Sequence, residues 1–531
     1  MAFRMRTPVL VIGAGLAGCV TALRLADHGV DVTLLASGAE AENANSWLAQ
    51  GGVIFRSKDS ADANALAKDV MIAGRQHNNA SAVQFLAQEG PGAVEDMLMQ
   101  RVGVPFDKRG TSASAPEGEW DLTREGGHST QRIVHCADHT GHTIMENLIR
   151  TVEAHPRIAF LRGYTAVDLL TSHHHTRGMT YRYQLENRCC GAYVLCEATN
   201  EVQCMLADMT VLATGGVGQV YLHTTNAASA TGSGIAMASR AFVRLENLEF
   251  VQFHPTTLFH MEPRRFLITE AMRGEGAVLV NAKGERFMQR YDARGELAPR
   301  DIVAQSIVTE ILENGEQCVF LDARSVPHNL TDRFPTVFQA CLDRGIDIRR
   351  QPIPVVPAAH YFCGGILTDE RGRTSLQGLY SVGECSCTGV HGANRLASTS
   401  LLEAVLWGRN AGDDIYSRMQ GGLPDMQALH AAIVDWESTG DENNDDPALI
   451  AQDWATIRHT MWNYVGITRT QTRLARAFED LRDLSRRLHA FYRSTPPSKD
   501  IIDLFHGCQT AYLITQSALR NRESLGCHNR V

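Results

Sequence analysis

Short apolar runs and a glycine-rich turn open the chain. Residues 9–12 are all apolar, Gly13-Ala14-Gly15-Leu16-Ala17-Gly18 follows, and apolar residues then recur with helical spacing as far as Ala26. Residues 30–35, Val-Asp-Val-Thr-Leu-Leu, supply a second, mostly apolar segment. Short apolar runs are typical of buried strands, and a 3.6-residue period is typical of a helix. The pattern therefore predicts a strand, a turn, a helix and a second strand parallel to the first.

Two later apolar runs have the same form. Residues 210–214 run into a Gly-Gly pair, and residues 378–384 precede another glycine-rich turn with a helix-like stretch at residues 400–411. We expect these elements to join the first ones in a single dinucleotide-binding domain. That domain would occupy residues 1–245 and 355–422, on either side of an insertion.

The insertion, residues 246–354, carries its own mixed pattern, including a helix-like stretch at residues 300–314. From residue 423 the chain is rich in helix formers, with amphipathic spacing in residues 454–461 and 470–492. We therefore predict an α/β and α+β multidomain protein. A Rossmann-like domain is interrupted by an α+β capping domain and followed by a C-terminal helical bundle over residues 423–531.

Charge, hydropathy and cysteine content argue against a nucleic-acid-binding, membrane-spanning or secreted protein. The formal net charge of −9 provides no basic surface for nucleic acid or an anionic membrane. The sequence contains no apolar run of about 18 residues, the length that a membrane span needs, and we expect no secretory signal. We expect a cytoplasmic protein whose 13 cysteines are reduced. Their spacing lacks paired Cys-x-x-Cys hooks, so we expect no metal site and keep metal binding as a minority alternative.

The glycines of the first turn have the spacing Gly-x-Gly-x-x-Gly. In a strand–turn–helix context this spacing favours a dinucleotide, because the glycines allow a tight turn and a close approach to a pyrophosphate. The spacing does not decide between FAD and NAD. The acid that usually binds the adenosine ribose after the second strand is missing, because Ala36-Ser37 stands there and Glu40 and Glu42 come only later. Ser37 or backbone groups would have to replace that contact.

Several further segments carry a resemblance to a known family. Besides Ala213-Thr214-Gly215-Gly216 and Gly383-Glu384, they are Trp47-Leu48-Ala49-Gln50-Gly51-Gly52, Gln252-Phe253-His254-Pro255-Thr256, Thr269-Glu270-Ala271-Met272-Arg273-Gly274-Glu275-Gly276, Pro299-Arg300-Asp301, Ala359-His360-Tyr361 and Gly389-Val390-His391-Gly392-Ala393-Asn394-Arg395-Leu396-Ala397. With them the chain resembles, over nearly its whole length, the flavoprotein family of fumarate reductase, succinate dehydrogenase and L-aspartate oxidase.

The resemblance implies FAD as the cofactor, with Glu384 on the ribityl hydroxyls and Ser400 and Leu401 near the flavin pyrimidine ring. In the respiratory relatives a histidine before the Gln-Gly-Gly-like turn carries the flavin covalently. No histidine lies between His28 and His77 here, so we predict non-covalent FAD. The full predicted cofactor set is Gly13, Gly15, Leu16, Ala17, Gly18, Ser37, Ser46, Gln50, Gly51, Gly52, Ala213, Thr214, Gly215, Gly383, Glu384, Asn394, Arg395, Ser398, Ser400 and Leu401.

Four side chains suit a C4 dicarboxylate substrate. His254, Thr269, His360 and Arg395 are residue types that donate charge-assisted hydrogen bonds to carboxylates. Each has a plainer alternative, since a lone histidine is often a satisfied core residue and Arg395 could simply hold a loop. Together with the surrounding motifs they favour a dicarboxylate site.

Arg300 matches the arginine that moves a proton in the fumarate-reducing relatives. A guanidinium is a poor base, because it stays protonated. A neutral form would need help from neighbours such as Glu270 or Glu275. The alternative is a structural ion pair with Asp301 or with another carboxylate of the cap. We predict a catalytic role for Arg300 and leave its nature open.

Glu125 is the predicted specificity residue. It stands in Thr123-Arg124-Glu125-Gly126-Gly127-His128-Ser129, a segment that resembles the aspartate oxidases, whereas the succinate and fumarate enzymes have a neutral glutamine at the matching place. An ammonium group buried beside a flavin needs an opposite charge, which a carboxylate supplies. The alternative is a surface carboxylate on a glycine loop.

The resemblance thus implies oxidation of L-aspartate to iminosuccinate. The reduced flavin would be reoxidised by O2 or fumarate, and the product would feed quinolinate and NAD biosynthesis, with a possible link to quinolinate synthase. Two alternatives stay open. One is a soluble fumarate reductase or succinate dehydrogenase flavoprotein subunit, which would need an iron-sulfur partner. The other is a flavoprotein-fold sensor without turnover.

Overall fold

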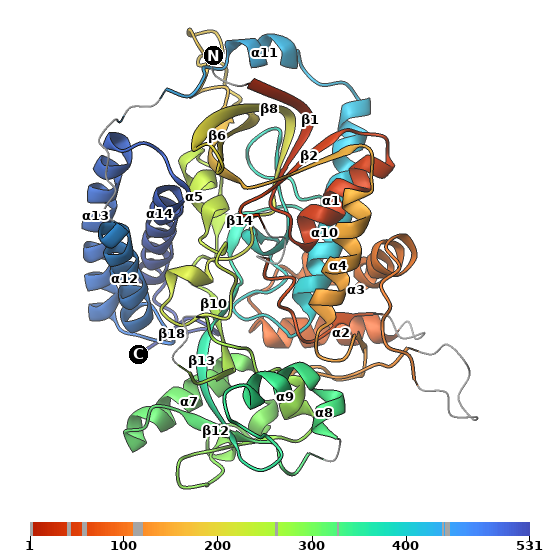
Figure 1. Cartoon of the computed structure of the whole chain (residues 1–531), viewed down its shortest axis with the longest axis vertical. Helices are drawn as coiled ribbons and strands as arrows, with labels where there is room; N and C mark the ends of the chain where they lie inside the picture. The colour runs from red at the N-terminus through yellow and green to blue at the C-terminus, as the bar shows by residue number, and fades with distance from the viewer. Residues whose placement is uncertain are drawn as a thin grey trace.

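The computed structural model describes residues 4–39, 44–55, 61–109, 120–260, 264–326, 329–437, 440 and 447–531. A seven-stranded sheet forms its centre (Figure 1), and its strand order is β5-β2-β1-β8-β7-β6, with β15 also paired to β8. The strands are β1 (Arg4–Ile12), β2 (Val32–Ala36), β5 (Ile158–Arg162), β6 (Tyr164–Thr171), β7 (Cys189–Cys196), β8 (Glu201–Leu212) and β15 (Leu379–Ser381). β5, β2, β1, β8 and β15 are parallel to one another, whereas β7 runs antiparallel to β8 and β6.

The two faces of this sheet are covered by different helices. Successive side chains of a strand point to opposite faces, and Val9 and Val11 of β1 face one core while Leu10 and Ile12 face another. The first core holds helices α1, α2, α3, α4 and α10. The second holds α5 and the C-terminal helices. The bounds are α1 (Leu16–Asp27), α2 (Ala61–Ala73), α3 (Ala80–Val94), α4 (Thr140–Glu153), α5 (Ser233–Arg240) and α10 (Thr399–Gln420).

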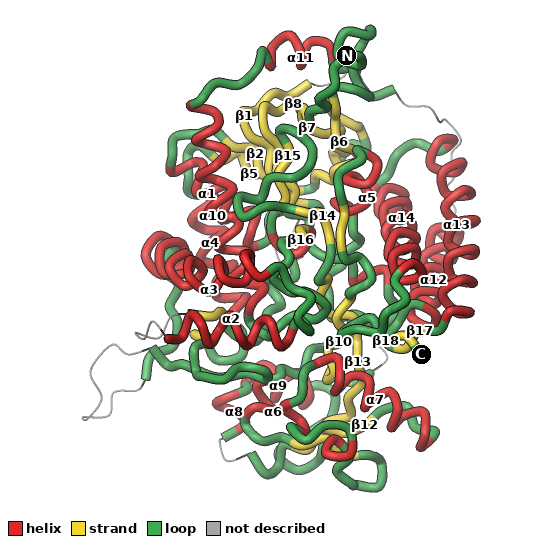
Figure 2. The backbone as a smooth tube through the Cα atoms, turned by 180° about the vertical axis from the view of Figure 1, so that it is seen from behind, coloured by secondary structure: helices red, strands yellow, loops and turns green. Residues whose placement is uncertain are grey.

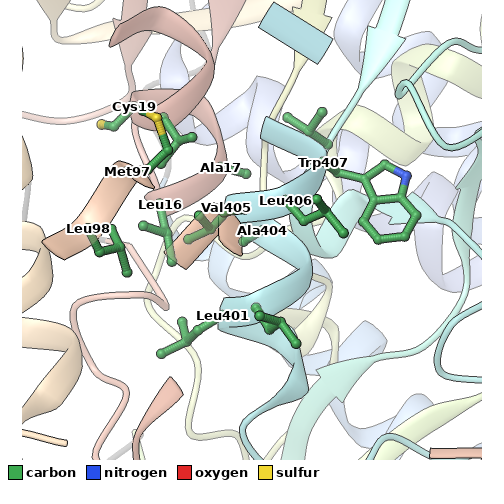
Figure 3. Close-up of a cluster of buried hydrophobic side chains, with 14 of the residues drawn as sticks. Leu16, Ala17, Cys19, Met97, Leu98, Leu401, Ala404, Val405, Leu406 and Trp407 are labelled. Carbon is green, nitrogen blue, oxygen red and sulfur yellow. The ribbon is translucent and has the colours of Figure 1, made fainter. Parts of the chain in front are cut away.

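Helices α1 and α10 pack against each other beside the sheet. Leu16 and Ala17 of α1 lie close to Leu401 and Ala404 of α10, together with side chains of the π-helical turn Glu95–Arg101 (Figure 3). These side chains are apolar and almost fully buried, so their burial holds the two helix N-termini next to each other.

The insertion forms an antiparallel sheet with its own core, seen at the bottom of Figure 1. The sheet has the order β10-β13-β12-β11. Its elements are β10 (Val251–Leu258), α6 (Ala271–Gly274), β11 (Val278–Val280), α7 (Arg300–Asn314), β12 (Val319–Asp322), α8 (Leu330–Arg333), α9 (Pro335–Leu342) and β13 (Ile353–Phe362). β13 crosses the expected boundary at residue 354 and carries the chain from the cap toward the central sheet. The four-part domain division itself stays a prediction.

Helices α12, α13 and α14 form the C-terminal region, along one side of the molecule in Figures 1 and 2. α14 packs against α5, because Thr510 Oγ1 donates a hydrogen bond of 3.0 Å to the carbonyl of Gly232. The remaining elements are α11 (Met426–Ala432), α12 (Pro447–Tyr464), α13 (Gln471–Ser494), α14 (Lys499–Arg520) and the short strands β3 (Val53–Ile54), β4 (Ile133–Val134), β9 (Leu245–Glu246), β14 (Gly365–Leu367), β16 (Ser386–Cys387), β17 (Thr468–Arg469) and β18 (Asn529–Arg530). Within the described ranges, no helix has both the length and the apolar character of a membrane span.

Most predicted elements are confirmed, with shifted ends. The opening strand–turn–helix–strand unit is present, and its two strands are parallel. The helix predicted at residues 300–314 is α7, with the same bounds. The strand predicted at residues 378–384 is wrong at its end, because β15 stops at Ser381 and a 3-10 turn, Gly383–Cys385, follows. Glu384 therefore stands in this turn and is not part of the sheet.

The close contact between α1 and the first turn yields a stability prediction. A Cβ atom at Gly18 would lie 1.9 Å from the carbonyl oxygen of Gly13, whereas a Cβ at Gly92 in α3 meets nothing within 4 Å. We expect Gly18→Ala to destabilise the protein by about 1–3 kcal/mol or more. Gly92→Ala should be neutral or slightly stabilising, because alanine is the better helix former. Urea unfolding of both variants checks this, and equal effects would contradict the packing argument.

Candidate active site

A continuous cavity runs from the first glycine turn to the edge of the cap. The predicted cofactor residues that line it are Gly13, Gly15, Leu16, Ala17, Ser37, Ser46, Gln50, Gly51, Gly52, Ala213, Thr214, Gly215, Gly383, Glu384, Arg395, Ser398, Ser400 and Leu401. Gly18 and Asn394 of the predicted set are not among the lining residues. The predicted substrate residues Glu125, His254, Thr269, Arg300, His360 and Arg395 line the same cavity. One space therefore brings together the two sets.

The glycine turn leaves its backbone open to the cavity. Gly13 has a φ of +112°, and a Cβ there would lie 2.2 Å from the carbonyl oxygen of Ala213. Gly15 is the N-cap of α1 and has no side chain to cap the helix. Ser46 supplies a partner instead, because its Oγ accepts a hydrogen bond of 3.2 Å from the backbone N–H of Leu16. A helix N-terminus approached this closely suits a pyrophosphate.

Glu384 lies in the middle of the cavity. Its carboxylate accepts hydrogen bonds from Asn45 Nδ2 at 3.0 Å and from the backbone N–H of Phe362 at 3.1 Å. Burial raises the pKa of this carboxyl from its ordinary value of 4.5 to about 7, and the two hydrogen bonds oppose that shift. Glu384 is therefore a buried acceptor beside the space that the predicted ribityl chain would cross.

The cap side of the cavity gathers cations and imidazoles. The rings of His254 and His360 have centroids 5.0 Å apart. His360 Nδ1 lies 2.8 Å from Thr225 Oγ1. Burial, followed by the charge of Arg300, lowers the pKa of both histidines well below 6.5, which leaves them neutral at physiological pH. A neutral imidazole still has one N–H to donate.

Arg395 lies over the ring of Tyr361, with its guanidinium carbon 4.4 Å from the ring centroid. Its Nη1 donates a 2.8 Å hydrogen bond to Ser400 Oγ. Burial and the neighbouring Arg300 lower the pKa of Arg395 to about 10, so it remains a cation at neutral pH. The arginine therefore keeps a positive charge inside the cavity without an acidic partner at contact distance among the described residues.

Arg300, the first residue of α7, is held by two side chains. Its Nε lies 2.5 Å from Glu270 Oε2, and its Nη1 donates a 3.0 Å hydrogen bond to Gln252 Oε1. Glu270 also pairs with Arg273, at 3.2 Å. Burial alone would raise the pKa of Glu270, but the two arginines outweigh it and the pKa is lowered.

The structural alternative for Arg300 was an ion pair with Asp301 or with another carboxylate of the cap, and Glu270 is such a carboxylate. Asp301 instead pairs with Arg75 at 2.5 Å and accepts a 3.1 Å hydrogen bond from Asn394 Nδ2. Of the two acids expected to assist Arg300, Glu270 contacts it, whereas Glu275 lies 3.7 Å from Arg333. The ion pair of Arg300 therefore lies inside the cavity and includes Glu270 alone among these acids.

Glu125 is buried, not a surface carboxylate. It is 6% exposed, and its Oε2 lies 2.5 Å from Ser398 Oγ. Gly51 makes room for it, since a Cβ there would lie 2.4 Å from Glu125 Oε1. Burial raises the pKa of Glu125, Glu270 raises it further, and the Ser398 hydrogen bond, Arg300 and Arg395 lower it. A buried carboxylate of this kind is most stable beside a further cation.

Comparisons with known proteins place the chain in a family. Residues 8–401 match the model of the FAD binding domain family, and residues 454–531 match that of the fumarate reductase flavoprotein C-terminal region. The chain is 44% identical to L-aspartate oxidase 1 of Ralstonia nicotianae over 99% of this chain and 95% of that protein. It is 38% identical to the chloroplastic L-aspartate oxidase of Arabidopsis thaliana over 98% of this chain and 80% of that protein.

The chain belongs to the L-aspartate oxidase family. Among solved structures, the fold matches E. coli quinol fumarate reductase with a TM-score of 0.86, at 28% identity, over 100% of this chain and 92% of that one. Adenylylsulfate reductase from Archaeoglobus fulgidus shares the fold alone, with a TM-score of 0.74 at 18% identity over 99% and 90% of the two chains. The L-aspartate oxidase family thus shares its architecture with the fumarate reductase flavoproteins.

The cavity of this L-aspartate oxidase family member fits FAD. Within the described part of the chain, Gln50 Oε1, Thr214 Oγ1 and Arg395 Nε are buried without a hydrogen-bond partner. Buried polar atoms normally have partners, and these residues line the cavity. A Cβ at Gly216 would also lie 2.2 Å from Glu384 Oε1. These unpartnered donors and acceptors and the bare glycine backbone are features that a large polar cofactor would satisfy.

The sequence did not predict several residues in or beside the cavity of this L-aspartate oxidase family member. Gln252 and Tyr361 stand within the quoted motifs, but only their contacts with Arg300 and Arg395 reveal a function for them. Tyr164, Thr165, Ala166 and Asp503 also line the cavity. No motif marks them, because β6 and α14 reach the cavity only through the tertiary fold. Glu40 and Glu42, weighed above as ribose anchors, lie outside the described residues.

The raised pKa of Glu384 yields a pH-dependent prediction for the apoprotein. The folded pKa of about 7 exceeds the ordinary value of 4.5. Ionisation of Glu384 therefore costs stability as pH rises from about 4.5 to 7, and the full cost, at most about 3 kcal/mol, applies above that range. Glu384→Gln removes this cost. Urea unfolding at pH 5 and pH 7.5 should show the variant gaining stability relative to wild type at the higher pH. A difference that stays constant with pH would contradict this.

Proposed function

We propose that the protein oxidises L-aspartate to iminosuccinate with non-covalently bound FAD. The observation that carries the proposal is Glu125, a buried carboxylate within the cation-rich end of the cavity. A dicarboxylate without an ammonium group would give Glu125 no opposite charge. L-aspartate supplies two carboxylates for the cations and one ammonium group for Glu125.

The charges of the site match those of this substrate. Arg300 and Arg395 are cations that would face the two carboxylates, and the neutral His254 and His360 would add hydrogen bonds without further charge. Thr269 would add a hydroxyl donor. The site thus holds the substrate from several directions, which fixes Cα before reaction.

Oxidation of the amino acid removes a hydride from Cα and a proton from the nitrogen. When bound, FAD supplies the acceptor for that hydride. Glu125 is suited to hold the ammonium and to accept its proton, because burial raises the pKa of its carboxyl. Exclusion of water by the cap would strengthen each of these contacts.

The same pocket would accept fumarate, which shares the two carboxylates of aspartate. Fumarate reduction adds a hydride and a proton across the double bond, and Arg300, held by Glu270, is the proposed proton donor. Reoxidation of the flavin by O2 or fumarate, and supply of the imine for quinolinate and NAD biosynthesis, complete the proposal. The lack of a histidine between His28 and His77 supports a dissociable cofactor.

The ammonium contact is tested by Glu125→Gln, which keeps the size of the side chain and its hydrogen bond with Ser398. We expect KM for L-aspartate to rise roughly 10- to 100-fold, the value of a charged hydrogen bond. The inhibition constant of succinate should change less than about twofold, because succinate lacks the ammonium group. Equal losses for both ligands would refute the ammonium role and favour a fumarate reductase or succinate dehydrogenase activity.

The proposed proton transfer is tested by Arg300→Leu. Turnover should fall roughly 10²- to 10⁴-fold, the usual contribution of a positioned acid or base, while flavin absorbance of the purified protein persists. Arg324→Leu is the control, since Arg324 is half exposed and pairs only with Asp322 among the described residues. Arg300 is not catalytic if its variant reduces the flavin with aspartate, and reoxidises it with fumarate, at wild-type rates.

A further inference from the structure

The adenosine end of the cavity lacks the usual carboxylate of the dinucleotide fold. β2 ends at Ala36, and Ala36 and Ser37 both line the cavity. An acid at this place usually binds a hydroxyl of the adenosine ribose. Neither residue carries a charge, so among the described residues a carboxylate for the ribose has to come from another element.

Among the described residues, Glu197 and Asp503 are two carboxylates near this end of the cavity, and the oxygens of Glu197 are bound by donors of the protein. Glu197 accepts hydrogen bonds from the backbone N–H of Gly38 at 3.0 Å and from Thr165 Oγ1 at 2.7 Å. Thr165 lines the cavity, and Gly38 follows Ser37, which also lines it. Glu197 therefore ties the loop after β2 to the start of β6, and its oxygens point at protein donors.

The second carboxylate, Asp503, faces the cavity itself. It stands on α14, lines the cavity with Tyr164 and Thr165, and interacts electrostatically with Glu197. Its side chain is 18% exposed and pairs with Lys499 one helical turn earlier. Burial raises the pKa of Asp503, and Lys499 opposes that shift.

The fold holds α14 firmly against this wall of the cavity. His506 Nε2 lies 3.1 Å from the carbonyl oxygen of Val167 in β6, and Gln509 Oε1 accepts a 2.6 Å hydrogen bond from Arg240 in α5. With the Thr510–Gly232 contact, these bonds fix the helix turns that follow Asp503. The position of the carboxylate is thus set by the packing of α14 on β6 and α5.

We propose that Asp503 accepts a hydrogen bond from a ribose hydroxyl in the adenosine half of FAD, in place of the acid missing after β2. The C-terminal helical region then contributes directly to retention of the cofactor. This inference goes beyond the oxidation of aspartate, because it concerns only how FAD is held. Binding of FAD would also stabilise the packing of α14 against β6 and α5.

The test compares Asp503→Asn with Asp500→Asn in protein freed of FAD. Asp500 is an exposed acid on the first turn of the same helix and serves as the matched control. Quenching of flavin fluorescence gives the dissociation constants of FAD and of FMN, which lacks the adenosine half. We expect Asp503→Asn to weaken FAD binding roughly tenfold or more and to leave FMN binding unchanged. Asp500→Asn should change neither constant.

Urea unfolding of each apoprotein accompanies the titrations, because loss of the Lys499 pair could alter the helix. The apoprotein of Asp503→Asn should unfold near the wild-type urea concentration, and FAD should protect it less. Unchanged FAD affinity would overturn the proposal, and so would equal weakening of FAD and FMN. Since every readout is cofactor binding or unfolding, failure here would leave the proposed reaction with aspartate untouched.

Discussion

Arg300 and Glu270 lie against each other inside the protein, where an unpaired charge would be costly. Arg300 opens α7 of the cap, and its second partner, Gln252, comes from β10. Gln252 in turn donates a 2.6 Å hydrogen bond to Asn394 Oδ1, in the loop before α10. The need to satisfy these buried polar groups therefore joins the cap to the cofactor-binding region at the site itself.

The electrostatic character of the cavity follows from that arrangement. Arg300 lowers the pKa of His254, His360 and Arg395, after burial itself. The imidazoles are thereby kept neutral, and the two arginines remain cations. The end of the cavity near the cap thus contains the cations Arg300 and Arg395, and Glu125 lies within reach of their charge. In the proposed function these cations bind the two carboxylates and Glu125 binds the ammonium group. In the proposed function, discrimination between aspartate and succinate depends on Glu125.

The glycine turn and the bounds of α7 could be predicted from the sequence, because residues close together in the chain determine them. The Gly13–Gly18 spacing predicted the turn beside the cavity, because only glycine fits its backbone contacts. The bounds of α7 were also predicted, since Pro299 precedes the helix and Gly315 ends it in a left-handed conformation. The motif residues at both ends of the cavity could be named, although their contacts could not.

The sequence did not predict β7, the full extent of β13 or the place of Asp503, because tertiary packing determines these features. β7 is buried along its whole length and carries cysteines, which gave no alternation to mark it as a strand added antiparallel to the sheet. β13 continues through the expected domain boundary, where it pairs with β12 over residues 353–355 and with β10 over residues 355–362. Asp503 reaches the cavity from a helix whose own pattern predicts only bundle packing. α14 and the end of β2 lie far apart in the sequence, so no local sequence pattern shows that they meet.

In the proposed function, the cavity selects an amino dicarboxylate for oxidation by FAD. The most direct test is an anaerobic titration of the FAD-loaded protein with L-aspartate, beside a parallel titration with succinate, followed by the absorbance of the oxidised flavin. We expect L-aspartate to bleach the flavin band and succinate to bind without bleaching it. Bleaching by succinate alone, or an oxidised flavin that persists with both ligands, would contradict it.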